Sequence, residues 1–109
     1  MALKANITID QGTTYSTNID VADDNGDPVD LTGFSGAAQL RKHYTSTNAH
    51  AFVVSIASAT GVVTLSMTAN VTANIAAGRY VYDCELTDPQ GTVSRLIEGI
   101  VTVTPQVTR

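Results

Sequence analysis

Polar and apolar residues alternate along most of this chain, which is the period-two pattern of strands with one buried face. The clearest run follows Gly78, where Tyr80, Tyr82, Cys84 and Leu86 share one parity and mainly polar residues occupy the other. Because its inward positions are large and uninterrupted, we expect this strand to lie in the middle of a sheet.

Similar alternation predicts six further strands. Between the fifth and sixth strands the period changes: Val71 and Ile75 stand four apart, which predicts a short helical turn that Thr68 caps and Gly78 ends. Seven strands separated by turn residues favour an all-β, antiparallel sandwich. The predicted strands cover residues 3–10, 15–21, 37–44, 52–56, 63–67, 80–87 and 92–104.

Glycine, proline and asparagine mark the turns. Residues 88–91, with the sequence D-P-Q-G, predict a type I turn. The Asn25-Gly26 pair predicts a tight hairpin with two positive φ angles. Pro28 has no amide proton to donate, so residues 29–31 are expected at a sheet edge.

Two other irregularities are visible. In the last strand Leu96 and Ile100 break the parity of the inward residues, and Gly99 between them suggests a β-bulge. Residues 45–50 form the longest run of small and polar residues and predict a mobile surface loop that ends with His50.

Composition limits the possible partners. A chain of 109 residues predicts a single domain, residues 1–109, that folds without crosslinks. Its net charge of −4 and only six Lys and Arg residues argue against a nucleic-acid partner. One cysteine excludes an internal disulfide, the start M-A-L-K-A-N lacks the features of a signal peptide, and no apolar run is long enough to span a bilayer. We therefore expect synthesis in the cytoplasm and no membrane association.

Acidic residues crowd one predicted hairpin. An EF-hand with Gly26 at its sixth position would place Val21 and Thr32 where acidic ligands are required, so that motif is absent. A looser calcium site stays open beside the simpler interpretation, a solvated turn, which we favour. The residues concerned are Asp20, Asp23, Asp24, Asp27 and Asp30.

No residue set predicts catalysis or a cofactor. His43 and His50 are the only histidines, and neither has the partners that a catalytic triad or a zinc site requires. Cys84 has inward parity and is expected to pack as a small hydrophobic residue. We predict no catalytic residue, no metal ligand, no cofactor and no enzymatic activity.

Two resemblances add to this interpretation. Tyr82 lies two residues before Cys84 and resembles the tyrosine of strand F in immunoglobulin-like sandwiches, whose hydroxyl bonds to upstream backbone. The chain has no second cysteine and no tryptophan, so it departs from antibody domains. The resemblance implies a seven-stranded antiparallel immunoglobulin-like β-sandwich with one short helical turn.

The second resemblance covers residues 5–108. The runs V-A-D-D-N-G-D-P-V-D-L-T-G, A-A-Q-L-R-K, G-V-V-T-L-S-M-T, A-G-R-Y-V-Y-D-C-E-L-T-D and G-T-V-S-R-L-I-E-G-I-V-T-V-T-P-Q-V-T are similar to small virion proteins of tailed bacteriophages, of the marine and cyanophage type. They also resemble the N-terminal sandwich domain of phage baseplate upper proteins. The resemblance implies a non-enzymatic structural protein located in the virion: a capsid cement or decoration protein, or alternatively a small tail or baseplate component.

A protein of this kind acts through contact area, and we expect its partners to be the major capsid protein or tail and baseplate subunits. We also expect a homo-oligomer, with a trimer as its form. A second possible function is a module that binds carbohydrate or a host surface, which exposed aromatic residues would favour. A third is a hydrolase, and the two poorly placed histidines argue against it. The outward positions that look too apolar for free solvent are Val53, Val62, Val81, Leu96 and Ile100.

Overall fold

The structure, a computed structural model, describes residues 3–22 and 25–107 and consists mainly of strands. The prediction of an all-β chain with one short helix is confirmed. In chain order the elements are β1 (Leu3–Lys4), β2 (Ile7–Asp10), β3 (Tyr15–Asp20), β4 (Ser35–Arg41), β5 (His50–Ala57), β6 (Val62–Met67), α1 (Ala69–Ala73), β7 (Gly78–Thr87) and β8 (Val93–Thr104).

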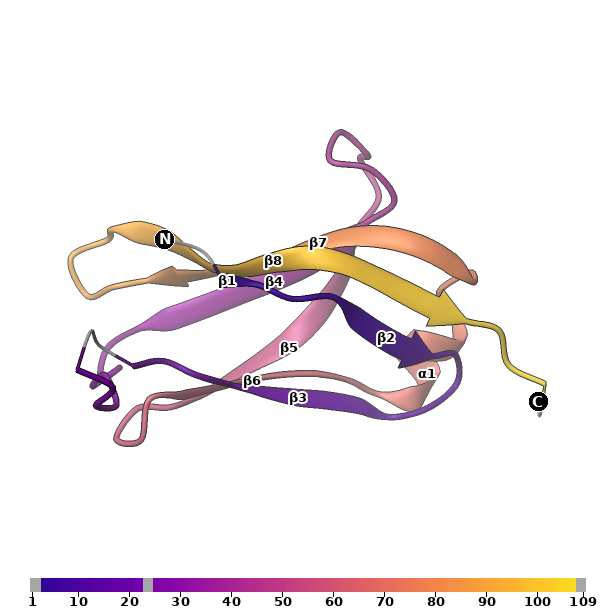
Figure 1. Cartoon of the computed structure of the whole chain (residues 1–109). Coiled ribbons are helices and arrows are strands. Elements are labelled where there is room, and N and C mark those ends of the chain that lie inside the picture. The colour runs from indigo at the N-terminus through magenta and orange to yellow at the C-terminus, as the bar shows by residue number, and fades with distance from the viewer. Residues whose placement is uncertain (1–2, 23–24, 108–109) are drawn as a thin grey trace.

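The strands form one curled sheet in the order β1-β8-β7-β4-β5-β6-β3, with β2 also paired to β8. Strand β5 belongs to both halves: its first residues pair with β4, and Val53–Ala57 pair with β6. The sheet therefore folds over on itself at β5. Figure 1 shows the result, with β8, β7 and β4 in one layer and β6 and β3 in the other.

Parallel pairing at one edge corrects the prediction of a purely antiparallel sheet. Strands β1 and β2 both run parallel to β8, with Leu3 opposite Ile97 and Asp10 opposite Thr104. The two ends of the chain are far apart in sequence, so no hairpin imposes an antiparallel direction on them. The predicted first strand is also split at residues 5–6, which gives eight strands instead of seven.

The inward side chains of the two layers form the core. All four residues of the central run, Tyr80, Tyr82, Cys84 and Leu86, are buried, so the predicted parity of β7 is confirmed. Residues from β2, β3, β4, β5, β6 and β8 and from two connections complete the core, namely Ile9, Ile19, Leu31, Ala38, Leu40, Phe52, Val63, Leu65, Met67, Ile75, Ile97, Val101 and Val103.

The bulge in β8 lies at Leu96 and not at Gly99. Cys84 pairs with Ile97, whereas the next residue of β7 pairs with Arg95, so Leu96 is the extra residue. Leu96 packs against the core beside Ile97. Gly99 instead allows the close approach of Ala5, because a Cβ atom at this position would collide with the carbonyl of Ala5.

The short helix differs from its prediction in two ways. Helix α1 ends at Ala73 with Asn74 as its C-cap, and Gly78, which was expected to end the helix, begins β7. The side chain of Thr68 makes no capping hydrogen bond. Ile75 is buried, but Val71, four residues before it, is exposed, because the helix ends after little more than one turn.

Two predicted turns also need correction. Gly26 has a φ of 84°, but no non-glycine residue among the described ones has a positive φ, so Asn25-Gly26 does not adopt the predicted two-positive geometry. Residues 29–31 form no strand, but the start of this segment does lie at the sheet edge, since Pro28 bridges Ala22 and the amide of Val29 donates to the carbonyl of Val21, directly after β3. The amide of Leu31 instead donates to the carbonyl of Ser58, and its side chain is buried in the core. The predicted turn at 88–91 is present, since the amide of Gly91 donates to the carbonyl of Asp88 at 3.0 Å.

Candidate functional site

The five predicted contact residues lie on different parts of the surface. Val81 and Ile100 are direct cross-strand neighbours on the outward face of β7 and β8, and Ile100 is 42% exposed. Val53 is 61% exposed on β5, Val62 begins β6 opposite Ala57, and Leu96 packs against the core. The structure therefore brings together one pair, Val81 and Ile100.

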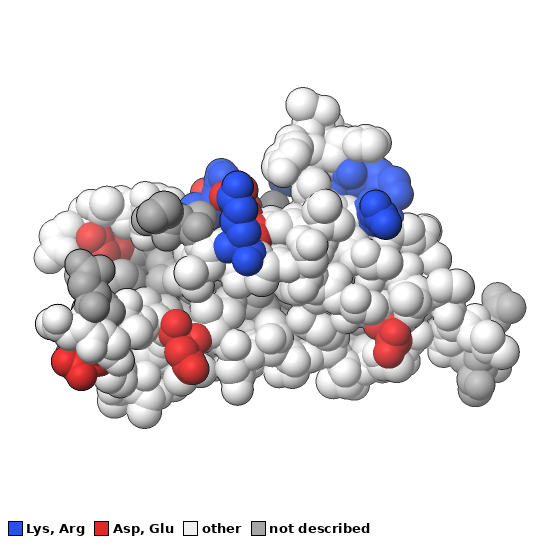
Figure 2. All heavy atoms as spheres, viewed as in Figure 1, with Lys and Arg blue, Asp and Glu red and all other residues white. Residues whose placement is uncertain are grey.

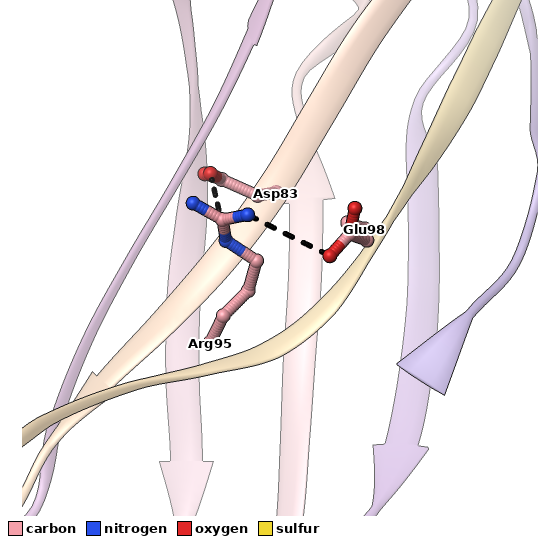
Figure 3. Close-up of polar contacts among 3 residues, drawn as sticks. All are labelled: Asp83, Arg95 and Glu98. Atoms are coloured by element: carbon pink, nitrogen blue, oxygen red, sulfur yellow. Dashed lines mark ion pairs between the residues drawn. The ribbon is translucent and has the colours of Figure 1, made fainter. Parts of the chain in front are cut away.

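A charged cluster lies next to this pair on the same face. Asp83 and Glu98 are direct cross-strand partners, a placement that is unfavourable for two carboxylates. Arg95 lies between them, with Nε 3.4 Å from an Asp83 oxygen and Nη1 3.6 Å from a Glu98 oxygen (Figure 3). The bulge at Leu96 sets this register, since it moves Arg95 one position along β7.

A shallow hollow of about 210 Å³ is lined by Val81 of this pair and by all three residues of the charged cluster. Tyr44 stands at its border with 81% of its surface exposed. The guanidinium of Arg41 is held in place by hydrogen bonds to the carbonyl of Ser46 and to the side chain of Gln39. The lining combines aromatic, aliphatic and charged groups, which is typical of protein-contact surfaces and also suits polar ligands. We call this hollow with Val81 and Ile100 the β4-β7-β8 face.

Charge is unevenly distributed over the molecule. On the face shown in Figure 2, the Lys and Arg side chains form two groups on the side of β7 and β8, and acidic side chains lie beside one of these groups and at separate positions elsewhere on the face.

The acidic hairpin contains a structural carboxylate. Asp30 accepts hydrogen bonds from the amide of Thr32 at 3.0 Å and from its hydroxyl at 2.6 Å. These bonds lower the pKa of the Asp30 carboxyl. Asp23 and Asp24 lie outside the described residues. Within residues 3–22 and 25–107, no three His, Cys, Asp or Glu side chains group as metal ligands would.

His50 and Cys84 have packing roles, whereas His43 is exposed. His50 begins β5 instead of ending a loop, and its ring lies edge-on to Tyr80 with centroids 6.4 Å apart, so the prediction of a mobile His50 is wrong. Residues 45–49 do form a projecting surface connection (Figure 1). Cys84 is fully buried, and burial, with Asp83 and Glu85 nearby, raises the pKa of its thiol to about 11.

Tyr82 does bond to upstream backbone, but at an unexpected place. Its hydroxyl donates to the carbonyl of Ala5 at 2.7 Å, between β1 and β2. The local bond expected of such a tyrosine comes from Tyr80, whose hydroxyl donates to the carbonyl of Ala76, four residues earlier, at 2.6 Å. Sequence parity located both rings in the core but not the partners of their hydroxyls.

Comparison with known proteins gives a likeness of fold only. No protein-family model and no curated protein matches the chain. Among solved structures, the internalin-like protein lmo2027 of Listeria monocytogenes is similar over 94% of this chain, with 16% identity and a TM-score of 0.50. A mutant of the SrpA adhesin from Streptococcus sanguinis is similar over 92%, with 15% identity and a TM-score of 0.54.

This chain spans 28% of the internalin-like structure and 55% of the adhesin structure, so it corresponds to a part of each. None of the helices that the structure describes is long and apolar enough to cross a membrane.

Proposed function

We propose that the protein is a non-enzymatic structural component of a tailed-bacteriophage particle, in particular a capsid cement or decoration protein. The proposal rests on the sequence resemblance over residues 5–108 and on one structural observation, the aliphatic pair Val81 and Ile100 on the β4-β7-β8 face. An exposed aliphatic pair beside a charged cluster supplies the apolar centre and polar rim of a protein contact. A tail or baseplate component would use the same face.

We further propose that the curled sheet is an immunoglobulin-like sandwich. The pairing of β3 with β6 and of β4 with β7 and β8, with β5 between the two layers, supports this assignment. In such a sandwich the β4-β7-β8 layer is a broad, regular surface available to a neighbouring subunit.

Particle incorporation tests the proposed role. Purified particles of the phage that carries the gene are probed with an antibody against the protein, after complementation with variants. Val81→Glu and Ile100→Glu place a charge in the aliphatic centre and are expected to abolish incorporation. Val53→Glu is the matched control, because Val53 is equally aliphatic but lies on β5. Absence of the native protein from particles would refute the virion role, and normal incorporation of Val81→Glu would refute the proposed face.

One observation favours a second candidate, a module that binds carbohydrate or a host surface. Tyr44 is 81% exposed and stands beside the hollow of the β4-β7-β8 face. An exposed ring next to Arg and carboxylate side chains can stack on a sugar and hydrogen-bond its hydroxyls. Glycan-array binding that Tyr44→Ala abolishes and Tyr44→Phe retains would support this candidate; no binding to any glycan would remove it.

A further inference from the structure

The two free edges of the curled sheet lie along one groove. Within the described residues β3 pairs with β6, and β1 and β2 pair with β8, so the sheet ends at these strands. The groove between them has a volume of about 460 Å³. Its apolar lining comes from both edges and from the core beneath, namely Leu3, Ile7, Tyr15, Ile19, Leu65 and Ile97.

The core is incompletely covered along this groove. Ile9 is fully buried, Ile7 is half-buried, and Leu3 is 53% exposed, although the three share one parity. Burial thus falls along the first strands with distance from the turn that joins β2 to β3. An apolar groove that reaches core residues such as Leu65 is a surface that another chain would stabilise by covering it.

Strand β3 presents unused backbone groups to this groove. The amide of Val21 donates to the carbonyl of Gly61 at 2.7 Å, which continues the ladder between β3 and β6. In an antiparallel ladder alternate residues bond to the same neighbour. The amides and carbonyls of Ser16, Asn18 and Asp20 therefore point toward the open edge, where they suit another strand.

The two edges differ in how they are protected. Natural sheet edges usually carry lysine, proline, a bulge or a very short strand. Strand β1 has two residues, one of them Lys4, and a break separates it from β2. By contrast, β3 has six residues in unbroken register with β6 and contains no lysine, proline or glycine. Of the strands at the two edges, β3 therefore offers the longest unbroken stretch for pairing, since β2 has four residues.

We propose that β3 pairs with β3 of a second copy, antiparallel about a two-fold axis through Thr17, which makes a dimer in place of the trimer expected from the sequence. This register places Tyr15 opposite Ile19, an aromatic and β-branched pair of the kind that stabilises sheets. It places Ser16 opposite Asn18, and no two carboxylates meet. The strand is uncharged from Tyr15 to Ile19, so it fits a copy of itself better than a strongly charged partner.

The groove supplies the remaining contact area. Pairing of six residues covers an edge only about 20 Å long, and such an edge alone does not supply the roughly 1,200 Å² that stable contacts bury. With the two β3 strands paired, the grooves of both copies open toward each other. Leu3 and Ile7 of one copy then face Leu3 and Ile7 of the second copy, and the exposed apolar surface of these side chains is buried in the dimer contact. The contact is separate from the β4-β7-β8 face, and the proposed virion role does not depend on it.

A proline on the open edge tests the contact. Asn18→Pro removes an amide that β6 does not use, so the monomer is expected to stay folded while pairing is blocked. Asn18→Ala is the matched control, because it also loses the side-chain bond from Thr64 but keeps the amide. By sedimentation velocity at 100 µM, the native chain and Asn18→Ala should have twice the monomer mass of 11.4 kDa, and Asn18→Pro the monomer mass.

A monomeric native chain, or a dimeric Asn18→Pro variant, would overturn the proposal.

A disulfide crosslink tests the same contact without a proline, and therefore also works if the Asn18→Pro variant fails to fold. Thr17→Cys lies on the two-fold axis, at a non-hydrogen-bonded pair whose Cα atoms approach to about 4.5 Å, within disulfide range. Mild oxidation should link this variant into dimers but leave Ser94→Cys, on the exposed part of β8 and outside the groove, unlinked, since Cys84 is buried and inert. Equal crosslinking of the two variants, or none, would contradict the pairing.

Discussion

The hydroxyl of Tyr82 donates a hydrogen bond to the carbonyl of Ala5, 77 positions earlier in the chain, at 2.7 Å. The bond joins the central strand β7 to the segment between β1 and β2. Tyr82→Phe removes only the hydroxyl and should lower the free energy of unfolding by about 0.5–1.5 kcal/mol. Tyr82→Ala also removes a buried ring and should cost about 3–5 kcal/mol. Urea unfolding followed by circular dichroism measures both, and equally mild effects would contradict the burial of this ring.

Gly99 allows the backbone of Ala5 to approach β8 beside Tyr82. A methyl group at this position would fall on the Ala5 carbonyl, so Gly99→Ala should displace the first strands and cost about 1–3 kcal/mol, as overpacked sites do. Hydrogen exchange at the Ala5 amide, which donates to Glu98, should accelerate. Ser94→Ala on the exposed part of the same strand is the control, and a similar loss there would show that β8 tolerates no change.

Arg95 offsets the repulsion between Asp83 and Glu98. Because all three side chains are partly exposed, Arg95→Ala should cost only about 0.5–1 kcal/mol at low salt, and less at 1 M salt, where charges are screened. Adding Glu98→Gln to the variant should restore stability, since it removes one of the two facing carboxylates. A loss that is independent of salt and of Glu98 would show that Arg95 acts through packing.

Burial of Cys84 links stability to alkaline pH. The pKa of this thiol is raised to about 11, so the folded state holds its proton after an unfolded chain has lost it. The resulting stability is fully present below about pH 9 and is lost as pH rises to about 11. Each unit between the two pKa values is worth about 1.4 kcal/mol, and the total is therefore about 3 kcal/mol.

Urea unfolding at pH 8, 9, 10 and 11 measures this loss. Cys84→Ala should be less stable at pH 8, because it leaves a small cavity, but should show a flatter decline between pH 9 and 11. The pKa of Tyr82, raised to about 12 chiefly by burial, continues the decline in both proteins above pH 10. An unchanged slope in Cys84→Ala would assign the alkaline loss to other groups. Reducing agent should leave the melting temperature unchanged at neutral pH.

Calcium should not bind tightly to the acidic hairpin. The carboxylate of Asp30 is already occupied by the amide and hydroxyl of Thr32. Titration calorimetry with calcium chloride should therefore show no site of micromolar or tighter affinity. A tight site that Asp24→Asn with Asp27→Asn abolishes would overturn the interpretation of this segment as a solvated turn.

Alternation of side chains predicts which face of a strand is buried, and for β7 it located every inward residue. It carries no information about which strands become neighbours or in which direction they run. The alternation therefore could not predict that β5 is shared between two layers or that β2 pairs in parallel with β8. The cluster around Arg95 depends on a one-residue shift of register at Leu96. The sequence suggested Gly99 as the site of this bulge, because glycine is found both at bulges and where another backbone approaches closely, and at Gly99 the second reason applies.

The parallel pairing of the first strands with the last one has a consequence for synthesis. Asp10 leaves the ribosome early, but its partner Thr104 is made 94 residues later. At about 5–20 residues per second, the first strand waits on the order of 5–20 s before its binding site exists. During that interval its apolar residues, Ile7 and Ile9 among them, have no sheet to join. Nascent chains are therefore vulnerable to aggregation and to holding by chaperones until β8 has been made.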